Sequence, residues 1–300
     1  MIDYEMSKEE KEYLAGYDRT AYPCPSLTAD VAVFAVMNEE TKEYRLDPVY
    51  RINLLLIKRG GYPYRGYWAL PGGFCRENES IEEAAARELM EETGIEDAYM
   101  ESFGMFSEAG RDPRGWIVSQ AYMALVDPSG YRIRSGSDAW EAEWFSLEVD
   151  EKVLSCEQLG DRSVERTQYR LELKDKKNKT TLSSAVIISR EQWLRKDTVS
   201  YEITDCNGLA FDHAKIILKA YLALRDRVEK DIRAIFYLMP GRFTLTSLQR
   251  IYEIVVNHEV ITPNFRRKIA PYVRETDEMI AGVGHRPARL FEPVLSVNVK

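Results

Sequence analysis

Alternation of apolar and polar residues predicts β-strands along the first two thirds of the chain. Residues 27–36 and 51–58 are rich in strand-forming side chains. Further strands are expected at residues 98–105, 116–126 and 142–145, and a hairpin at residues 166–173 and 180–188 across a polar turn at 175–179.

Helices are predicted where the apolar spacing changes from two residues to three or four. Residues 80–93 are strong helix formers, with Ser80 and Glu83 as a capping box at the start and Gly94 as a left-handed stop. Residues 212–228 carry an apolar stripe and are expected to form a longer amphipathic helix.

The length of the chain and a proline–glycine pair indicate two domains. At about 150 residues per domain, 300 residues predict two, and the proline and glycine at positions 240 and 241 mark the boundary region. We expect a polar extension at residues 1–25 with a short helix near 8–14, a first domain at 26–232 and a second at 233–300.

The net charge of −8 averages over two unlike parts. Residues 241–300 hold nine Lys and Arg against six Asp and Glu, a local charge of +3 that leaves −11 for the rest. The four cysteines are widely spaced, no apolar run approaches the ~18 residues of a membrane helix, and the N-terminus has no signal-peptide pattern. A reduced, cytoplasmic protein without a membrane segment is expected.

Three glutamates fall on one face of the helix predicted at residues 80–93. Glu88, Glu91 and Glu92 are spaced i, i+3, i+4, and clustered carboxylates repel one another unless a cation neutralises them. Mg²⁺ is a suitable cation because it prefers oxygen ligands and keeps substrate phosphates in its shell. The alternative is an ordinary solvated glutamate face.

The positions of glycines, glutamates and an arginine over a longer stretch favour a metal site over a solvated glutamate face. Gly73 is followed by Glu79 after five residues and by Arg87-Glu88 after seven more, and the stretch continues through Glu91-Glu92 to Gly94-Ile95. This segment closely resembles the box of the Nudix hydrolases. The resemblance implies an α+β fold, an α/β/α sandwich with a mixed sheet, and hydrolysis of a diphosphate by attack of water.

The resemblance also implies roles for single residues. Glu88, Glu91 and Glu92 would hold Mg²⁺ or Mn²⁺ with the Gly72 carbonyl as a further ligand, Arg87 would orient the glutamates, and Glu79 would support the loop. The metal would neutralise phosphate charge and lower the pKa of the attacking water. The general base stays open between a box glutamate and a later acid, for which Glu141 and Glu143 are the candidates.

The segment 110–116 is the first indication of a substrate. Arg111 and Arg114 have forks that match phosphate oxygens, and Trp116 offers a ring for stacking on a base; such a loop is also typical of a surface turn held by ion pairs. Residues 110–126, with residues 68–74 and 209–213, are similar to ADP-ribose pyrophosphatase-like Nudix proteins. This implies ADP-ribose or a related nucleoside diphosphate sugar as ligand, with His213 a structural hydrogen-bonding residue rather than a metal ligand.

The last sixty residues outline a helix-turn-helix. Residues 244–256 form an amphipathic helix capped by Thr244 or Thr246, and residues 262–269 a second, basic helix with Pro263 in its first turn. Strands at 273–275 and 288–291 would pair around the glycines at 282 and 284 as a wing. The candidate DNA contacts are Arg266, Arg267, Lys268, Arg286 and Arg289.

Two alternatives to DNA binding stand beside this interpretation: a small helical pack with exposed cations, and a unit that only dimerises an enzyme. The winged-helix half of the Nudix-related regulators of NAD metabolism (NrtR-like) resembles three segments of this chain, residues 243–249, 264–268 and 286–288. The resemblance implies a homodimer that binds palindromic DNA. It also implies that the Nudix domain senses ADP-ribose or a related nucleotide. Many such regulators have degraded boxes, whereas this box is complete. We therefore expect a Nudix pyrophosphohydrolase that also regulates, with a purely sensing regulator as the alternative.

One segment exceeds what a minimal Nudix domain needs. We predict that residues 159–207, which include the expected hairpin, are an insertion in the Nudix domain. It would extend the sheet, form part of a dimer interface or act as a lid.

Overall fold

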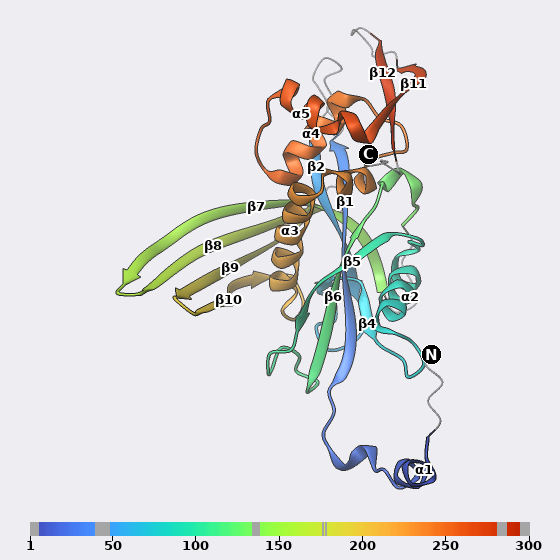
Figure 1. Ribbon diagram of the computed structural model, residues 1–300, viewed down its shortest axis with the longest axis vertical. Coiled ribbons are helices and arrows are strands. Elements are labelled where there is room, and N and C mark those ends of the chain that lie inside the picture. Colours follow the sequence, from blue (N-terminus) through green and yellow to red (C-terminus); the bar gives the residue numbers. More distant parts are fainter. Residues whose placement is uncertain are drawn as a thin grey trace.

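The computed structural model describes residues 6–39, 49–133, 139–175, 177, 179–280 and 287–294. Ten strands form one mixed sheet: β1 (Ser26–Glu39), β2 (Val49–Arg59), β3 (Trp68–Ala69), β4 (Gly72–Phe74), β5 (Tyr99–Phe106), β6 (Ile117–Leu125), β7 (Ala139–Leu159), β8 (Arg162–Asp175), β9 (Thr180–Trp193) and β10 (Lys196–Asn207). The order is β10-β9-β8-β7-β2-β1-β6-β5, with β3 beside β2 and β4 beside β1 (Figure 1). β1 and β6 are parallel, whereas the other pairs are antiparallel.

Helices cover both faces of the central strands. α2 (Ile81–Thr93) buries Ala84, Ala85 and Leu89 against β1 and β4 on one face. α3 (His213–Lys230) packs on the other face and is buried along most of its length. The α+β class and the α/β/α sandwich are confirmed.

Local signals at α2 act as the sequence predicts. The side chain of Ser80 accepts a hydrogen bond from the Glu83 amide, and the Glu83 carboxylate accepts one from the Ser80 amide. Gly94 ends the helix at φ +75°, a left-handed conformation that glycine adopts without a Cβ penalty. The carboxylate-bearing helix is therefore fixed at both ends by its own sequence.

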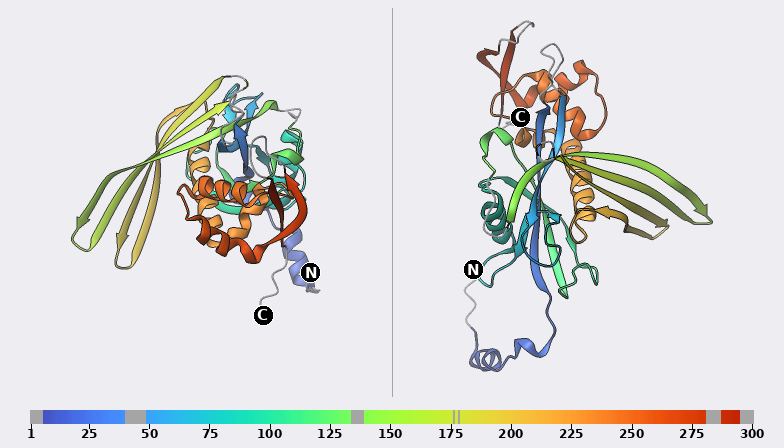
Figure 2. Two further views of the ribbon diagram at one scale, coloured as in Figure 1. Left: turned by 90° about the horizontal axis from the view of Figure 1, so that it is seen from above. Right: turned by 180° about the vertical axis from the view of Figure 1, so that it is seen from behind.

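The hairpin expected within residues 159–207 is confirmed, and it belongs to a larger unit. β7 to β10 continue the central sheet and project from the body as a curved ribbon (Figures 1 and 2). The expectation of a short strand at 142–145 is wrong in length, because β7 has 21 residues. Its outer half is exposed, so it shows no burial-driven alternation. Of the three roles considered for this segment, extension of the sheet is the one that the structure shows.

The C-terminal part has the expected helix-turn-helix and wing. η3 (Ile232–Leu238) leads to α4 (Leu245–Val256) and α5 (Thr262–Ile269), and η4 (Ala270–Tyr272) leads to the antiparallel pair β11 (Val273–Ile280) and β12 (Ala288–Pro293). Thr244 caps α4 by accepting a hydrogen bond from the Ser247 amide. The wing's glycine turn and Arg286 lie outside the described residues.

The apolar core runs without interruption from the sheet into this C-terminal part. Leu248 and Val255 of α4 belong to the same buried cluster as Leu224 and Val228 of α3. The expected break near Pro240 falls between η3 and α4, where the backbone changes direction while the core continues.

The N-terminal extension carries one short helix. α1 (Lys8–Ala15) matches the expectation at residues 8–14 and has no buried residue. Within the described ranges, no helix is long and apolar enough to cross a membrane.

Candidate functional site

A cavity of about 780 Å³ opens where α2, β4, the end of β2 and the start of α3 meet. Its acidic lining residues are Asp30, Glu88, Glu92 and Asp112. Its basic and aromatic lining residues are Arg59, Arg76, Arg111, Arg114, Phe74, Phe211 and His213. Charges of both signs therefore face one polar space.

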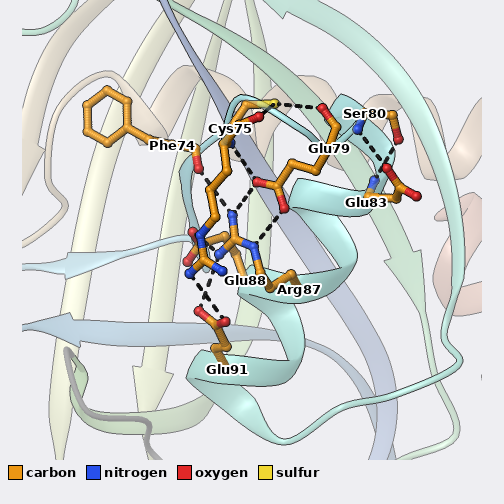
Figure 3. A network of polar contacts seen from close by, with 9 residues as sticks. Phe74, Cys75, Glu79, Ser80, Glu83, Arg87, Glu88 and Glu91 are labelled. Atoms are coloured by element: carbon orange, nitrogen blue, oxygen red, sulfur yellow. Dashed lines mark hydrogen bonds and ion pairs between the residues drawn. The ribbon is translucent and has the colours of Figure 1, made fainter.

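Arg87 organises the loop before α2 (Figure 3). Its guanidinium donates to both carboxylate oxygens of Glu79 at 2.9 and 2.6 Å, to Glu88 at 2.6 Å and to Glu91 at 3.2 Å. It also reaches the Phe74 carbonyl at 3.1 Å. The hydrogen bonds from Arg87 lower the pKa of Glu79 to about 2. Arg87 and Glu79 thus hold the loop before α2 onto the helix.

Glu92 is the deepest of the box carboxylates. It is 9% exposed and accepts a hydrogen bond from the Gly72 amide at 2.8 Å. Burial raises its pKa to about 8, and the nearby charges of Glu88 and Asp30 act in the same direction. A carboxyl group in this position favours a bound cation, which would stabilise its ionised form.

Two glycines allow the close approach of strand and helix. Gly72 has φ +156°, and a Cβ there would lie 2.2 Å from the Ala29 carbonyl oxygen. A Cβ on Gly73 would lie 2.4 Å from the Glu88 carboxylate. Only glycine leaves room for β4 between β1 and the carboxylates.

The donor set fits a hard divalent cation in part. Glu88 and Glu92 line the cavity and supply the oxygen ligands that Mg²⁺ and Mn²⁺ prefer. Glu91 instead faces Arg76 and Arg87, at 3.4 and 3.2 Å. Among the described residues no three Asp, Glu, His or Cys side chains converge as metal ligands. Glu91 would have to leave its arginine partners to join the other two.

The two arginines predicted to bind substrate both lie at the cavity but are paired with acids. Arg111 donates twice to Asp212, at 2.7 and 3.0 Å, and Arg114 donates to both oxygens of Asp112. The ion-paired alternative is therefore the one that the structure shows for their forks. Trp116 is 57% exposed and does not line the cavity.

Phe74 and Phe211 are the rings that sequence reasoning missed. The Arg114 guanidinium lies 5.0 Å from the centre of Phe74 and 5.3 Å from that of Phe211. Phe211 precedes the first turn of α3, within the 209–213 string that the sequence singled out only as a family marker. Cation–π contact holds these groups together at the cavity wall.

Arg59 is a further cavity residue that the sequence did not indicate. Its Nε donates to the Pro63 carbonyl at 2.9 Å, and its guanidinium lies 4.8 Å from the centre of Phe211. Burial lowers its pKa, and the neighbouring Arg114 adds to the effect. Within the described ranges it makes no ion pair. The sequence did carry one signal for Arg59, because it is a charged residue at the end of a strand that is mostly apolar.

His213 is a structural hydrogen-bonding residue, as expected. Its Nδ1 accepts a hydrogen bond from the Leu70 amide at 2.9 Å, which leaves the ring proton on Nε2, 3.9 Å from Asp30. Burial lowers the pKa of His213, so the ring is neutral. Asp30 also accepts a 2.5 Å hydrogen bond from Ser119.

The two later acids considered as general base lie elsewhere on the sheet. Glu141 pairs with Lys58 at 3.7 Å and Glu143 with Lys177 at 3.2 Å, and neither lines the cavity. Glu141 and Glu143 therefore do not reach the cavity that Glu88 and Glu92 line.

The predicted DNA contacts lie far along the chain, on α5 and the wing. Arg266, Arg267 and Lys268 are exposed on α5, whereas Arg289 of β12 pairs with Glu275 of β11 at 2.6 Å.

Comparisons with known proteins agree with both halves. The NUDIX domain family matches residues 27–155, and the NrtR DNA-binding winged helix domain family matches residues 235–292. A protein of Acinetobacter baylyi described as an ADPR responsive transcriptional repressor is 31% identical over 94% of this chain and 87% of its own length. The chain belongs to this family of Nudix-related regulators. An ADP-ribose pyrophosphatase of Methanocaldococcus jannaschii is 38% identical over 37% of the chain and 71% of the relative.

A solved structure shares the whole architecture. A MutT/nudix family protein from Enterococcus faecalis is 26% identical, with a TM-score of 0.66 over 95% of this chain and 93% of that one. The match therefore spans both the projecting sheet and the winged helix of this chain.

Proposed function

We propose that this protein is a DNA-binding regulator whose Nudix cavity binds ADP-ribose or a related nucleoside diphosphate sugar as its effector. The descriptions of the Acinetobacter repressor and the Methanocaldococcus pyrophosphatase support the ligand class. Arg59, which makes no ion pair among the described residues, and the rings of Phe74 and Phe211 suit a diphosphate and a base.

The observation that carries the proposal is the path of α3. Its first residue, His213, lines the cavity together with Phe211 just before the helix, and its later turns pack against α4 of the winged helix. Near its end, Arg227 donates to Glu101 of β5 at 2.8 Å. A ligand that displaces the start of this buried helix would therefore displace the surface that supports the DNA-binding helices.

A mobility-shift titration tests the proposal. Duplexes from upstream of the protein's own gene and its neighbours are titrated with full-length protein, with and without ADP-ribose. We expect sequence-specific binding whose Kd changes about five-fold or more with ADP-ribose, the usual range of allosteric coupling. Binding that is blind to sequence and disappears with salt would contradict the proposal.

Hydrolysis of the effector is a second candidate function, favoured by the complete set of box glutamates. When bound, a divalent metal would neutralise diphosphate charge and lower the pKa of an attacking water. Glu88 and Glu92 would hold it at the cavity wall, while Arg87 and Glu79 keep the loop and helix in register.

The enzymatic candidate is tested by product analysis with ADP-ribose and Mg²⁺ or Mn²⁺. Glu92→Gln should slow release of AMP by about 100-fold or more, as removal of a charge-stabilising group does. Glu96→Gln, three residues beyond the end of α2 on the exposed surface, is the matched control and should behave as wild type. No turnover by the wild type would remove hydrolysis and leave the regulator intact.

A homodimer on palindromic DNA belongs to the same proposal, since a two-fold protein matches a two-fold site. Sedimentation equilibrium of the full-length protein should give twice the chain mass of 34.7 kDa.

A further inference from the structure

α5 presents an outward face that is distinct from its flanks. Phe265 and Ile269 are 2% and 0% exposed and fix the inner face of this eight-residue helix. At about 100° per residue, Arg267 lies opposite them with Asn264 beside it. Arg266 and Lys268 fall on the two flanks. The helix contains no acidic residue, so its exposed surface is positively charged.

Contacts within α5 and between α4 and α5 further distinguish the side chains of the outward face from those of the flanks. Arg267 donates to the Asn264 side-chain oxygen at 3.2 Å, so the two polar ends lie together on the outward face. The Lys268 ammonium is drawn back onto α4, where it donates to the Tyr252 hydroxyl at 3.1 Å and lies 5.1 Å from the ring centre.

The start of α5 is held in place by α4. The Gln249 side chain donates to the Val260 carbonyl and the Thr262 hydroxyl, both at 3.1 Å. Glu253 accepts from the Val260 amide at 3.0 Å. These bonds fix the turn between the helices, which gives the outward face a defined direction.

The wing does not share this positive character. Arg274 pairs with Glu292 and Arg289 with Glu275. In the described parts of β11 and β12, four acids (Glu275, Asp277, Glu278 and Glu292) outnumber these two arginines. α5 therefore offers the better surface for a polyanion.

We propose that Asn264 and Arg267 read adjacent base pairs in the DNA major groove, while Arg266 on the flank of α5 contacts a phosphate. The assignment rests on the proposed DNA-binding function and adds which residues carry sequence preference. Asparagine pairs in bidentate fashion with adenine and arginine with guanine. Because the two side chains touch one another, the bases they read are expected to be neighbours. A flanking cation meets the backbone, which carries no sequence information.

Selection from a random duplex library with full-length protein tests the division of roles. Asn264→Ala should lose an adenine preference at one position, and Arg267→Ala a guanine preference next to it, each by about tenfold. Arg266→Ala is the matched control: it should select the wild-type motif with lower affinity and a salt slope smaller by about one. Arg267→Lys should keep the salt slope and weaken the guanine preference, because lysine can still donate to guanine but lacks the planar two-donor fork of arginine.

Thermal unfolding of each variant checks that α5 is intact. If Asn264→Ala and Arg267→Ala both select the unchanged wild-type motif, the assignment of base reading to these two residues is overturned, and the DNA-binding function still stands. An altered motif in Arg266→Ala, with none in Arg267→Ala, would do the same. A wild type that selects no motif would overturn the DNA-binding function together with it.

Discussion

The cavity and the outward face of α5 are both rich in arginine, and they use it differently. At the cavity, Arg111 is 6% exposed in its side chain and is bound to Asp212, and Arg87 is 14% exposed and bound to Glu79. On α5, Arg266 and Arg267 are exposed and have no carboxylate partner among the described residues. Burial of a charge requires a partner within the protein, whereas an exposed charge remains available to a ligand.

Arg59 is the cavity residue that behaves like those of α5. It is half-buried, its guanidinium faces Phe211, and it has no ion pair within the described ranges. Residue type alone therefore does not distinguish an arginine that stabilises the fold from one that is available to a ligand. The difference among these residues is an ion pair with an internal acid, which Arg111 and Arg87 make and Arg59 does not make within the described ranges.

The largest expected effect comes from breaking a buried pair. Arg111→Met leaves Asp212 buried without its partner and should lower the free energy of unfolding by about 3–5 kcal/mol. Arg266→Met, the matched exposed arginine, should change it by less than about 0.5 kcal/mol. Urea unfolding measures both. The double variant Arg111→Met/Asp212→Leu should recover much of the loss, and equal effects of the two single variants would contradict the comparison.

Sequence reasoning succeeded where signals are local. The capping box at Ser80 and Glu83, the stop at Gly94 and the spacing of the glutamates act within a few residues, so α2 and its carboxylate face were predictable. The basic α5 with Pro263 in its first turn was predictable for the same reason.

Sequence reasoning failed where partners are distant or patterns are weak. The Arg111–Asp212 pair joins residues 101 positions apart, and nothing in the 110–116 segment indicates that its fork is occupied. The length of β7 was missed because its outer half is exposed and shows no burial-driven alternation. Phe211 and Arg59 meet only through tertiary structure.

Arg59 provides the second prediction, on ligand binding rather than stability. Arg59→Gln should weaken ADP-ribose binding by about ten- to a hundredfold, the value of a charged hydrogen bond, while the affinity for adenosine, which lacks phosphate, stays unchanged. Calorimetric titration measures both ligands. Arg65→Gln, on the loop that follows β2 and outside the cavity lining, is the control. Equal loss for adenosine would assign Arg59 to the base instead of the diphosphate.

The smallest effect is expected at the wing, where an exposed arginine already has an acid partner. Arg289 pairs with Glu275 at 2.6 Å, and both side chains are more than half exposed. Arg289→Gln should therefore weaken DNA binding by less than about twofold, and Glu275→Gln should strengthen it by about twofold, since surface pairs contribute little. Fluorescence anisotropy at two salt concentrations measures the change, which should fade at the higher one. If Arg289→Gln instead costs as much affinity as Arg267→Gln, pairing with an internal acid does not decide which arginines are available to DNA.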